Sequence, residues 1–558
     1  MNQKNQNTAI YYKPDGYNTQ TKRLLGRQSA GEGFLKAYVQ SNDKNTLYCY
    51  SGNDEEFKHF RQLVTPWLKE SCDFKFLSTT QPHQLNEVNN LYIPGPGLAD
   101  FAWQRRFYDQ RAYSICGVTH TIASKEAITN IGNLLTAPIQ PWDALICTSN
   151  AVKVAVDKIL DDWKEYLGER LNSNINLDLK LPIIPLGVEA DKFQYNPEFR
   201  NNIRQRLNIA SEDIVILFVG RLIFYAKGHP VPMYLALEKA AKKVNHKHKI
   251  HLIQCGWFED DKEASSFKES ATLFSPSINH VFLDGRNPEI RQQIWSSADI
   301  FISLADNIQE TFGLTPIEAM AAGLPVIVSD WNGYQESIRH EVDGFRISTV
   351  IPTQNNALDL ASYYLSDHMN YSTYIAHASL ATMIDIDECA AAFVELIDNS
   401  DLRAKMGENG KQRVKEIYDW QNVIKSYREL WQELAEIKNI IQMSVPVKKG
   451  NPFHPLCDDP FNLFSHYSTE YLTSEINLTL GSMAENSSLE KIRNIWITNF
   501  GNNYRLSNSV IDAIIVDLKN NQFLSVGFFI SIYGKENQHL LIRTLLYLLK
   551  FDILKIKH

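Results

Sequence analysis

Four charged residues in the second half of the chain have the types and spacing to bind a phosphorylated, hydroxyl-rich molecule. Glu310 and Glu318 are separated by seven residues in the stretch ETFGLTPIE. Arg221 and Lys227 begin and end the stretch RLIFYAK. Two cations can neutralise a diphosphate both in the ground state and as a leaving group. The two carboxylates suit neutral hydroxyl groups beside the phosphates, so a nucleotide sugar is a ligand of the right kind.

The segment 299–344 predicts the elements that position the two glutamates. Residues 300–304 and 326–329 are short apolar runs typical of strands buried on both faces, and a helical segment lies between them. This pattern predicts a parallel strand–helix–strand unit. The loop 307–314 then follows the carboxyl end of a strand and leads into a helix N-terminus, where free amides and the helix dipole favour an anion. We expect a phosphate site in this loop.

The start of the helix is predicted from its capping residues. Thr315 is expected to be the N-cap, Pro316 fits the first helical position, and Glu318 completes a capping box. Considered alone, Glu318 is more often only a capping residue, and Glu310 alone would be a solvated loop acid. The functional interpretation therefore rests on the two glutamates together.

Arg221 and Lys227 follow a predicted buried strand at 214–220. Two cations just beyond a parallel strand, with a helix after them, favour a diphosphate site. The alternative is an ordinary solvated loop, because basic loop residues are common.

Gly31 and Gly33 lie before a predicted helix near the start of the chain. A glycine-bearing loop that enters a helix lets the backbone approach a phosphate closely, although a flexible turn explains the two glycines equally well. The loop has no Walker pattern, because Glu32 stands where the lysine is required, and the G-x-G-x-x-G pattern is absent too.

His120 follows a predicted strand at 113–118 and therefore lies at the carboxyl end of that strand. A single histidine is more often structural than catalytic. The position of His120 alone does not decide between these two roles.

Composition agrees with a multi-domain globular enzyme. The 558 residues predict two to four domains, and 44% hydrophobic with 22% charged residues argues against long disorder. The net charge of −8 gives no global attraction for nucleic acid. The seven cysteines are far apart and form no C-x-x-C pair, which predicts neither a disulfide framework nor a zinc site. With no signal-peptide pattern and no long apolar run, a cytoplasmic protein is expected.

The pattern around the two glutamates resembles a known family. E-x(7)-E with F-G-L after the first glutamate, then P-x-E-A-M-A-x-G-x-P-V, and a G-x-x-E turn at Gly333 to Glu336 are similar to the retaining glycosyltransferases of the glycogen-synthase-like superfamily, group 1, family 4 type. The resemblance covers roughly residues 8–440. It implies an α/β protein of GT-B fold, with two Rossmann-like domains facing across a cleft and a C-terminal appended region. The expected boundaries are 1–195 for the acceptor-side domain, 196–410 for the nucleotide-sugar domain, 411–440 for a helix crossing back, and 441–558 for the appended region.

The resemblance assigns nucleotide-binding roles to residues of the second domain. G-R-L followed by K-G makes Arg221 and Lys227 the phosphate-binding pair, and the loop carrying Arg286 lies against the nucleotide base. Together with Gly31 and Gly33 from the glycine-bearing loop, the whole set of candidate nucleotide-binding residues is Gly31, Gly33, Arg221, Lys227, Arg286, Phe312, Gly313, Leu314, Thr315 and Glu318.

The resemblance also implies roles around the sugar. Glu310 would hold sugar hydroxyls, Glu318 the ribose, and His120 the sugar from the opposite domain. The leaving diphosphate would help to deprotonate the acceptor, while Arg221 and Lys227 stabilise its developing charge. The expected catalytic set is thus His120, Glu310, Arg221 and Lys227, with no metal and no bound cofactor.

The predicted function is a retaining transfer of sugar from a nucleotide diphosphate sugar to a saccharide or lipid-linked acceptor, in polysaccharide or glycolipid biosynthesis. A phosphorylase-like enzyme of the same fold, or a non-catalytic subunit that binds nucleotide sugars, remain alternatives. No nucleic-acid partner is expected.

Residues 441–558 lie outside the resemblance. Their pattern predicts a small α or α+β unit that ends in a helix with a basic end, LLIRTLLYLLKFDILKIKH. This tail either docks on the catalytic domains or makes a peripheral contact with an anionic membrane surface at the inner face of the membrane.

Overall fold

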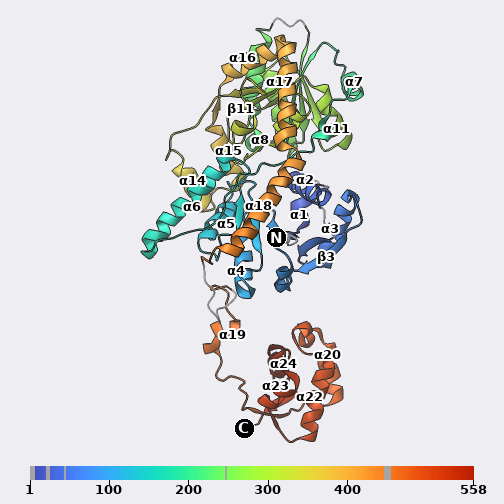
Figure 1. Ribbon diagram of the computed structural model, residues 1–558, viewed down its shortest axis with the longest axis vertical. Helices are drawn as coiled ribbons and strands as arrows, with labels where there is room; N and C mark the ends of the chain where they lie inside the picture. The colour runs from blue at the N-terminus through green and yellow to red at the C-terminus, as the bar shows by residue number, and fades with distance from the viewer. Residues whose placement is uncertain (1–6, 20–25, 43–45, 245–247, 445–453, 558) are drawn as a thin grey trace. The chain divides into compact units, whose positions relative to one another are not determined.

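The computed structural model describes residues 7–19, 26–42, 46–244, 248–444 and 454–557. The chain forms two compact units, Met1–Leu456 and Cys457–His558. The first unit contains two parallel six-stranded sheets, and the second contains a three-stranded sheet. Figure 1 shows the elements in chain order.

The first sheet has the strand order β3-β2-β1-β4-β5-β6. Its strands are β1 (Thr8–Tyr11), β2 (Thr46–Ser51), β3 (Asp73–Ser78), β4 (Asn90–Ile93), β5 (Ser114–Val118) and β6 (Ala144–Ile146). All pairs are parallel. This is the strand order of a Rossmann sheet, in which the direction of winding reverses between the first and fourth strands.

The second sheet repeats that order as β12-β11-β10-β7-β8-β9. Its strands are β7 (Ile214–Val219), β8 (Ile250–Gly256), β9 (Asn279–Asp284), β10 (Ile300–Ser303), β11 (Val326–Ser329) and β12 (Gly344–Ile347). The predicted strand–helix–strand unit is present, since β10 and β11 pair in parallel with Phe301 opposite Val326. The α/β class with two Rossmann-like domains is therefore confirmed.

Helices cover both sheets. Those of the first domain are α1 (Pro14–Tyr17), α2 (Gly26–Gln40), α3 (Asp54–Val64), α4 (Leu98–Tyr108), α5 (Lys125–Gly132) and α6 (Asn150–Leu171). The second domain has α7 (Pro197–Arg206), α8 (Phe224–Lys227), α9 (Pro230–Ala241), α10 (Asp261–Phe274), α11 (Pro288–Ser297), α12 (Leu314–Ala321), α13 (Tyr334–Ser337), α14 (Leu358–Leu365), α15 (Tyr371–Leu380), α16 (Ile386–Asp398) and α17 (Ser400–Arg413). A two-stranded sheet of β13 (Thr349–Val350) and β14 (Met383–Ile384) precedes α16.

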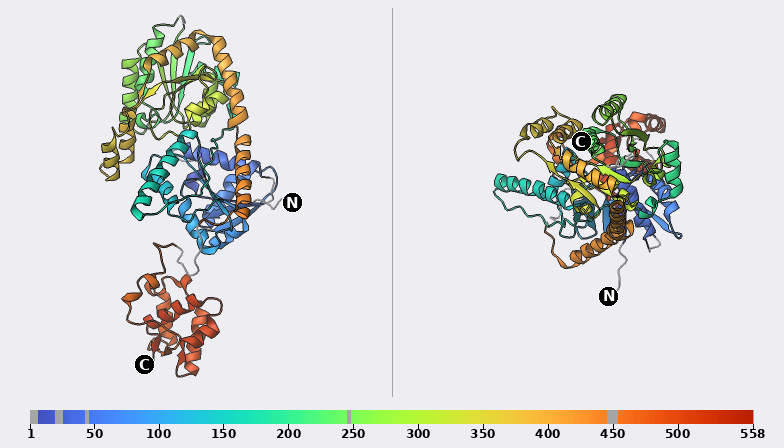
Figure 2. Two further views of the ribbon diagram at one scale, coloured as in Figure 1. Left: turned by 60° about the vertical axis from the view of Figure 1, so that its left-hand side comes forward. Right: turned by 90° about the horizontal axis from the view of Figure 1, so that it is seen from above.

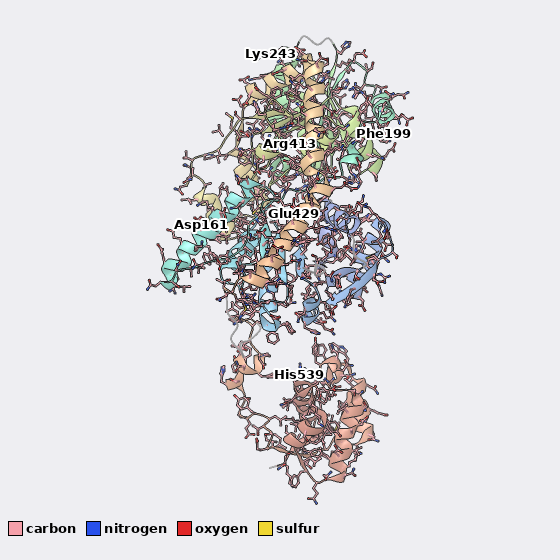
Figure 3. The ribbon with its side chains drawn as sticks, viewed as in Figure 1. Asp161, Phe199, Lys243, Arg413, Glu429 and His539 are labelled. Atoms are coloured by element: carbon pink, nitrogen blue, oxygen red, sulfur yellow. The ribbon has the colours of Figure 1, made fainter. Side chains whose placement is uncertain are left out.

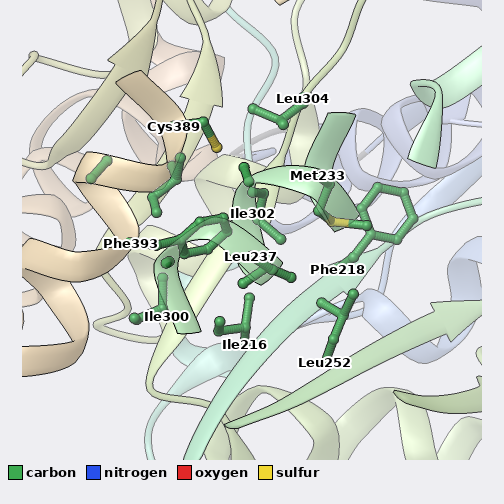
Figure 4. Close-up of a cluster of buried hydrophobic side chains, with 14 of the residues drawn as sticks. Ile216, Phe218, Met233, Leu237, Leu252, Ile300, Ile302, Leu304, Cys389 and Phe393 are labelled. Carbon is green, nitrogen blue, oxygen red and sulfur yellow. The ribbon is translucent and has the colours of Figure 1, made fainter. Parts of the chain in front are cut away.

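One face of the second sheet packs on α9 and α16. Ile216 and Ile302 from neighbouring strands contribute to one cluster with Leu237 of α9 and Phe393 of α16, and all four side chains are fully buried (Figure 4). Such interdigitated apolar packing is the main source of stability in a parallel sheet, because both faces are removed from water. It gives the strand ends of this domain a rigid base.

Helix α18 (Trp420–Ile440) follows α17 and packs on the first domain. Trp420, Tyr427 and Trp431 belong to the same buried cluster as Phe34 of α2 and Tyr92 of β4. Figure 2 shows α17 and α18 following one another. In Figure 3 the two helices are marked by Arg413 and Glu429.

The predicted loop around Gly31 and Gly33 is wrong, because α2 begins at Gly26 and both glycines lie inside it. A Cβ on Gly31 would lie 2.1 Å from the carbonyl oxygen of Gly16, and one on Gly33 would lie 2.6 Å from Nε1 of Trp420. Glycine therefore allows α2 to approach α1 and α18 closely. The two residues have a packing role, and the geometric reason for a phosphate contact is lost.

The second unit is a small α+β fold. Its sheet has the antiparallel order β16-β15-β17, formed by β15 (Asn477–Leu480), β16 (Leu524–Ser525) and β17 (Leu554–Ile556). Its helices are α19 (Pro460–Leu463), α20 (Asn486–Asn494), α21 (Trp496–Asn499), α22 (Asn508–Asn520), α23 (Val526–Tyr533) and α24 (Gln538–Lys550). Leu478 of β15 packs with Ile514, Phe529 and Leu545 in its core.

The prediction that the chain ends in a helix is only partly right. Helix α24 stops at Lys550, Asp552 takes a positive φ of 54°, and β17 follows. Leu554 is buried and Lys555 is exposed, so the side chains alternate as in a strand. Within the described residues, no helix is both long enough and apolar enough to cross a membrane.

Candidate functional site

The site lies where β7 and β10 are neighbours in the second sheet, at the point where the winding reverses. The segment after β7 carries Arg221 and, at the end of α8, Lys227, and the loop after β10 carries Glu310. Gly228 has a φ of +134°, and a Cβ there would lie 2.5 Å from the carbonyl oxygen of Leu304. Only glycine permits this close approach, which brings the two loops together. In open α/β sheets ligands bind at such a reversal.

Lys227 and Glu310 form an ion pair, with 2.7 Å between Nζ and Oε2. The Glu310 side chain is 11% exposed and that of Lys227 is 29% exposed. Burial alone would raise the pKa of Glu310, but the Lys227 charge and hydrogen bond and the amides of Thr311 and Phe312 lower the pKa below its ordinary value. Two residues that the sequence placed in separate loops are thus in direct contact. A diphosphate that binds Lys227 therefore has to compete with the Glu310 carboxylate for the Lys227 ammonium group.

Arg221 is a desolvated cation. Burial lowers the pKa of its guanidinium, and the nearby Tyr225 and Glu310 oppose that shift. The guanidinium donates no hydrogen bond to another residue in the part of the chain that the structure describes. A half-buried arginine stays charged, and leaving its donors without an acceptor is costly. This is the electrostatic signature of a site for an anion.

The backbone at Glu310 is held by three polar side chains that the sequence patterns did not single out. Asn307 is fully buried, and its Oδ1 accepts hydrogen bonds from the amides of Gln309 and Glu310, both at 3.1 Å. Asn332 donates to the carbonyl of Glu310 at 3.0 Å, and the Trp331 indole donates to the carbonyl of Asn307 at 2.9 Å. An asparagine followed by a tight turn is the local signal that could have identified Asn307. The contacts fix the direction of the Glu310 side chain.

The predicted capping box is wrong. The N-cap of α12 is Gly313, with a φ of +87° and no side-chain capping bond, so Thr315 and Pro316 already lie inside the helix. A Cβ on Gly313 would lie 1.9 Å from the Tyr334 ring. The ring and the left-handed turn require glycine here, which moves the helix start two residues earlier than capping rules suggest. The first amides of α12, from Leu314 on, are without intrahelical partners and remain suited to an anion.

Glu318 therefore has no capping duty. Its carboxylate accepts no hydrogen bond from the described residues. Burial raises the pKa of Glu318 to about 7, against the opposing charges of Arg291 and Lys227. A half-buried carboxyl without partners is available to hydroxyl groups of a ligand.

Asp306 ties the β10 loop to α15. Its Oδ1 accepts a hydrogen bond from the Ser379 hydroxyl at 2.7 Å, and its Oδ2 accepts from the His229 amide at 3.0 Å. Burial raises the pKa of Asp306 to about 6, although these hydrogen bonds lower it. The group is structural, since it is only 2% exposed.

His120 lies just beyond β5, as predicted, and is half-buried. Burial and the charge of Arg27 on α2 lower the pKa of His120 to about 4, so its imidazole is neutral at pH 7. The next residue, Thr121, is 3.3 Å from the Tyr371 hydroxyl, which donates to Oε1 of Gln309 at 3.3 Å. A short chain of contacts therefore connects the His120 segment to the residue before Glu310.

A second set of contacts joins the two domains beside the site. Glu336, the last residue of the G-x-x-E turn, accepts hydrogen bonds from the amides of Asn150 and Ala151 at 2.6 and 3.2 Å. A carboxylate at a helix N-terminus is favourable, and here the helix is α6 of the first domain. Ser149 donates to the carbonyl of Thr311 at 2.9 Å. The turn therefore aligns the first domain with the Glu310 loop.

The remaining predicted residues are less central. Phe312 is 3% exposed and packs on the Tyr418 ring in the core. Arg286 follows β9 at the sheet edge, is forked onto Asp284 at 2.8 Å, and has a side chain that is 55% exposed. Leu314 and Thr315 are half-buried at the start of α12. The structure thus brings together Arg221, Lys227, Glu310 and Glu318, and it leaves Arg286 apart from them.

Comparison with known proteins identifies the second domain. Residues 199–367 match the family described as "Glycosyl transferases group 1". The uncharacterized glycosyltransferase MJ1607 of Methanocaldococcus jannaschii is 31% identical over 169 residues, covering 30% of this chain and 40% of that protein. The lipopolysaccharide 1,2-N-acetylglucosaminetransferase of Salmonella typhimurium is 23% identical over 249 residues, covering 44% of this chain and 55% of that protein.

The chain spans about half the length, or less, of these curated relatives. Among solved structures, Anabaena Alr3699/HepE in complex with UDP is 15% identical with a TM-score of 0.49, covering 77% of this chain and all of that one. The matched residues 199–367 contain all four charged residues that meet at the β7 and β10 loops. The similarity to the group 1 glycosyltransferase family is therefore carried by the second domain, where these charged residues lie.

Proposed function

We propose that this chain transfers a sugar, with retention of configuration, from a nucleoside diphosphate sugar to a saccharide or lipid-linked acceptor. The observation that carries the proposal is the state of Arg221. Its desolvated guanidinium has no hydrogen-bond acceptor among the described residues and lies beside the Lys227–Glu310 pair. An anion at this place would supply the missing acceptors.

The diphosphate is proposed to bind between the β7 loop and the start of α12. Arg221 and Lys227 offer charge, and the first amides of α12 after Gly313 offer donors along the helix dipole. Charge develops on the diphosphate as the glycosidic bond breaks, so these fixed donors stabilise the transition state more than the ground state. No step requires a metal ion; within the described residues no group of three or more His, Cys, Asp or Glu could hold one. Metal independence remains a prediction.

The sugar is proposed to lie between Glu310 and His120. The Glu310 carboxylate accepts hydrogen bonds from sugar hydroxyls, and the neutral His120 imidazole can donate one bond and accept another. The bond between the sugar carbon and the diphosphate oxygen breaks while the acceptor oxygen bonds to the same face. The acceptor proton passes to the departing diphosphate oxygen, which explains why no separate base or nucleophile is needed.

The nucleoside is proposed to lie beyond the diphosphate, with Glu318 at the ribose hydroxyls. Arg286 belongs to the loop nearest the base but is not needed for the transfer. An acceptor in polysaccharide or glycolipid synthesis agrees with the name of the Salmonella relative, which acts on lipopolysaccharide.

The test is turnover with a panel of UDP-, GDP- and ADP-sugars, with release of nucleoside diphosphate as the readout. At least one sugar nucleotide should be consumed, and Arg221→Ala should lose that activity. Arg206→Ala is the matched control, because Arg206 is an exposed arginine at the end of α7 in the same domain. Consumption of inorganic phosphate with release of a sugar phosphate would instead support a phosphorylase. Binding of a sugar nucleotide without turnover, with every acceptor class, would support a non-catalytic subunit.

A further inference from the structure

The C-terminal unit contains a polar cavity of about 310 Å³, a size at the lower end of small-molecule sites. Its polar lining consists of Asn499, Asn502, Asn503, Arg505, Ser507 and Asn508. This part of the chain lies outside the matched residues 199–367. The cavity is therefore separate in sequence from the glycosyltransferase site.

The lining excludes several classes of ligand. It has no carboxylate, so a divalent cation is disfavoured. Its one cation, Arg505, is already engaged, because the guanidinium lies 3.6 Å from the Tyr547 ring centre and donates to the carbonyl of Asn499 at 3.2 Å. Only Leu506 and Ile511 add apolar surface, which is too little for a lipid chain. A neutral, polar ligand remains.

Each asparagine side chain can donate two hydrogen bonds and accept two, because its carbonyl oxygen has two lone pairs. Each primary amide offers two N–H donors and a carbonyl acceptor, which match neighbouring hydroxyl groups that both donate and accept. The side chains of Asn502, Asn503 and Asn508 make no hydrogen bond to other described residues. Asn502 and Asn503 are exposed, so these amides are open to a ligand.

Large aromatic side chains alternate with these asparagines along the chain. Trp496, Phe500 and Tyr504 are 74%, 73% and 62% exposed. The rings of Trp496 and Phe500 lie 5.8 Å apart, and Gly501 turns the chain after them with a φ of +70°. The three rings do not line the cavity itself but adjoin its lining residues in sequence, and exposed aromatic surface of this kind is typical of binding sites. A pyranose fits them, because its faces carry C–H groups while its rim carries hydroxyls.

We propose that the segment 495–508 of the C-terminal unit binds a neutral saccharide of one or two sugar units. The amides of Asn502, Asn503 and Asn508 hold its hydroxyls, and the neighbouring aromatic rings cover its faces. The choice of a saccharide over another neutral polar ligand rests on the proposed function of the first unit. The role of this second site is to hold the acceptor glycan on the same chain as the transferase.

The experiment uses the full chain, without nucleotide, and titrates it calorimetrically with glucose, N-acetylglucosamine and their short α- and β-linked oligomers. At least one of these should bind, and an Asn502→Ala, Asn503→Ala double variant should weaken that binding by about tenfold or more. Asn520→Ala is the control, because Asn520 is exposed on α22 and does not line the cavity. Trp496→Ala should weaken binding too, and should remove the change in tryptophan fluorescence that saccharide causes in the unmodified chain.

Two outcomes would overturn this proposal. One is that no saccharide of the panel binds the unmodified chain at millimolar concentration. The other is that the double variant, with an unchanged melting temperature, binds as tightly as the unmodified chain. Failure of the transferase proposal would look different, since sugar nucleotides would not be turned over while saccharide binding would still depend on Asn502 and Asn503.

Discussion

The two Rossmann-like domains have the same strand order but carry different chemistry at the point where the winding reverses. In the second domain the loops after β7 and β10 present Arg221, Lys227 and Glu310. In the first domain β1 is followed by Tyr12 and Lys13, and β4 by the stretch PGPG. Two sheets with the same strand order therefore carry different residues at this point. The second sheet is followed by three charged side chains, and the first mainly by an aromatic side chain, a lysine and a loop of proline and glycine.

The state of the cations makes the difference clearer. Lys13 is paired with Glu56 at 2.9 Å, and its side chain is 45% exposed. Arg221 is desolvated and has no hydrogen-bonded acceptor in the described part of the chain. Function is therefore set by the loops and not by the sheet order, which agrees with the general behaviour of this fold. In the proposed function, the charged domain binds the donor diphosphate and the other domain binds a neutral acceptor.

The largest effect is expected at Arg221, which would break the comparison most directly. Arg221→Ala should lower turnover on the order of a hundredfold or more, because charge stabilisation of the leaving diphosphate is lost. Steady-state kinetics with the best sugar nucleotide measures this. Near-normal turnover in Arg221→Ala, together with normal turnover in Arg206→Ala, would mean that the second domain holds its cation for another reason.

Glu310→Gln should affect transfer of the sugar without weakening binding of the nucleoside diphosphate. Turnover should fall by about a hundredfold, because the interaction lost belongs to the reacting sugar. Affinity for the free nucleoside diphosphate should not fall, since Lys227 is released from its pair with Glu310. Calorimetry with the nucleoside diphosphate and kinetics on the same preparation check both parts. A variant that loses the nucleotide and keeps its turnover would contradict the assignment.

Glu318→Gln should change how stability depends on pH. The pKa of Glu318 is about 7 in the folded protein, above its unfolded value, so the folded state binds more protons between the two values. The unmodified protein should therefore lose stability as pH rises from about 5 to 8, and part of that loss should disappear in Glu318→Gln. Melting temperatures of both proteins across this range measure it. Parallel curves would show that Glu318 is not desolvated as the structure indicates.

Much of the sheet framework could be predicted from the sequence. The run 326–329 predicts β11 with its bounds, because β-branched residues between Pro325 and Asp330 form a pattern typical of a short buried strand. Arg221 and Lys227 follow β7, and Glu310 follows β10, as the strand–loop–helix order predicts. These features depend on local sequence and on the rule that parallel strands share one carboxyl edge.

The errors came from contacts between distant segments. The start of α12 is set by the Tyr334 ring against Gly313, and the glycines of α2 are set by Gly16 and Trp420. None of these contacts leaves a local periodicity. For the same reason the sequence did not reveal that Tyr371 and Gln309 connect the His120 segment to the Glu310 loop. The domain boundaries and the individual site roles stay predictions.

The smallest effect is expected at Lys13, and it sharpens the comparison between the two domains. If the first domain serves a neutral acceptor, Lys13 has no part in holding the diphosphate. Lys13→Ala should then change nucleoside diphosphate affinity by less than about twofold, because an exposed lysine that is already paired contributes little at a distance in salt. The other carboxylate oxygen of Glu56 accepts a hydrogen bond from the Gly52 amide at 2.7 Å. This contact does not involve Lys13, so it remains in the Lys13→Ala variant. Calorimetry at low and moderate salt should be used to measure the affinity of Lys13→Ala and of Arg221→Ala for the nucleoside diphosphate. A loss of nucleotide affinity in Lys13→Ala as large as that in Arg221→Ala would show that both domains bind the diphosphate. The assignment of donor and acceptor to different domains would then be wrong.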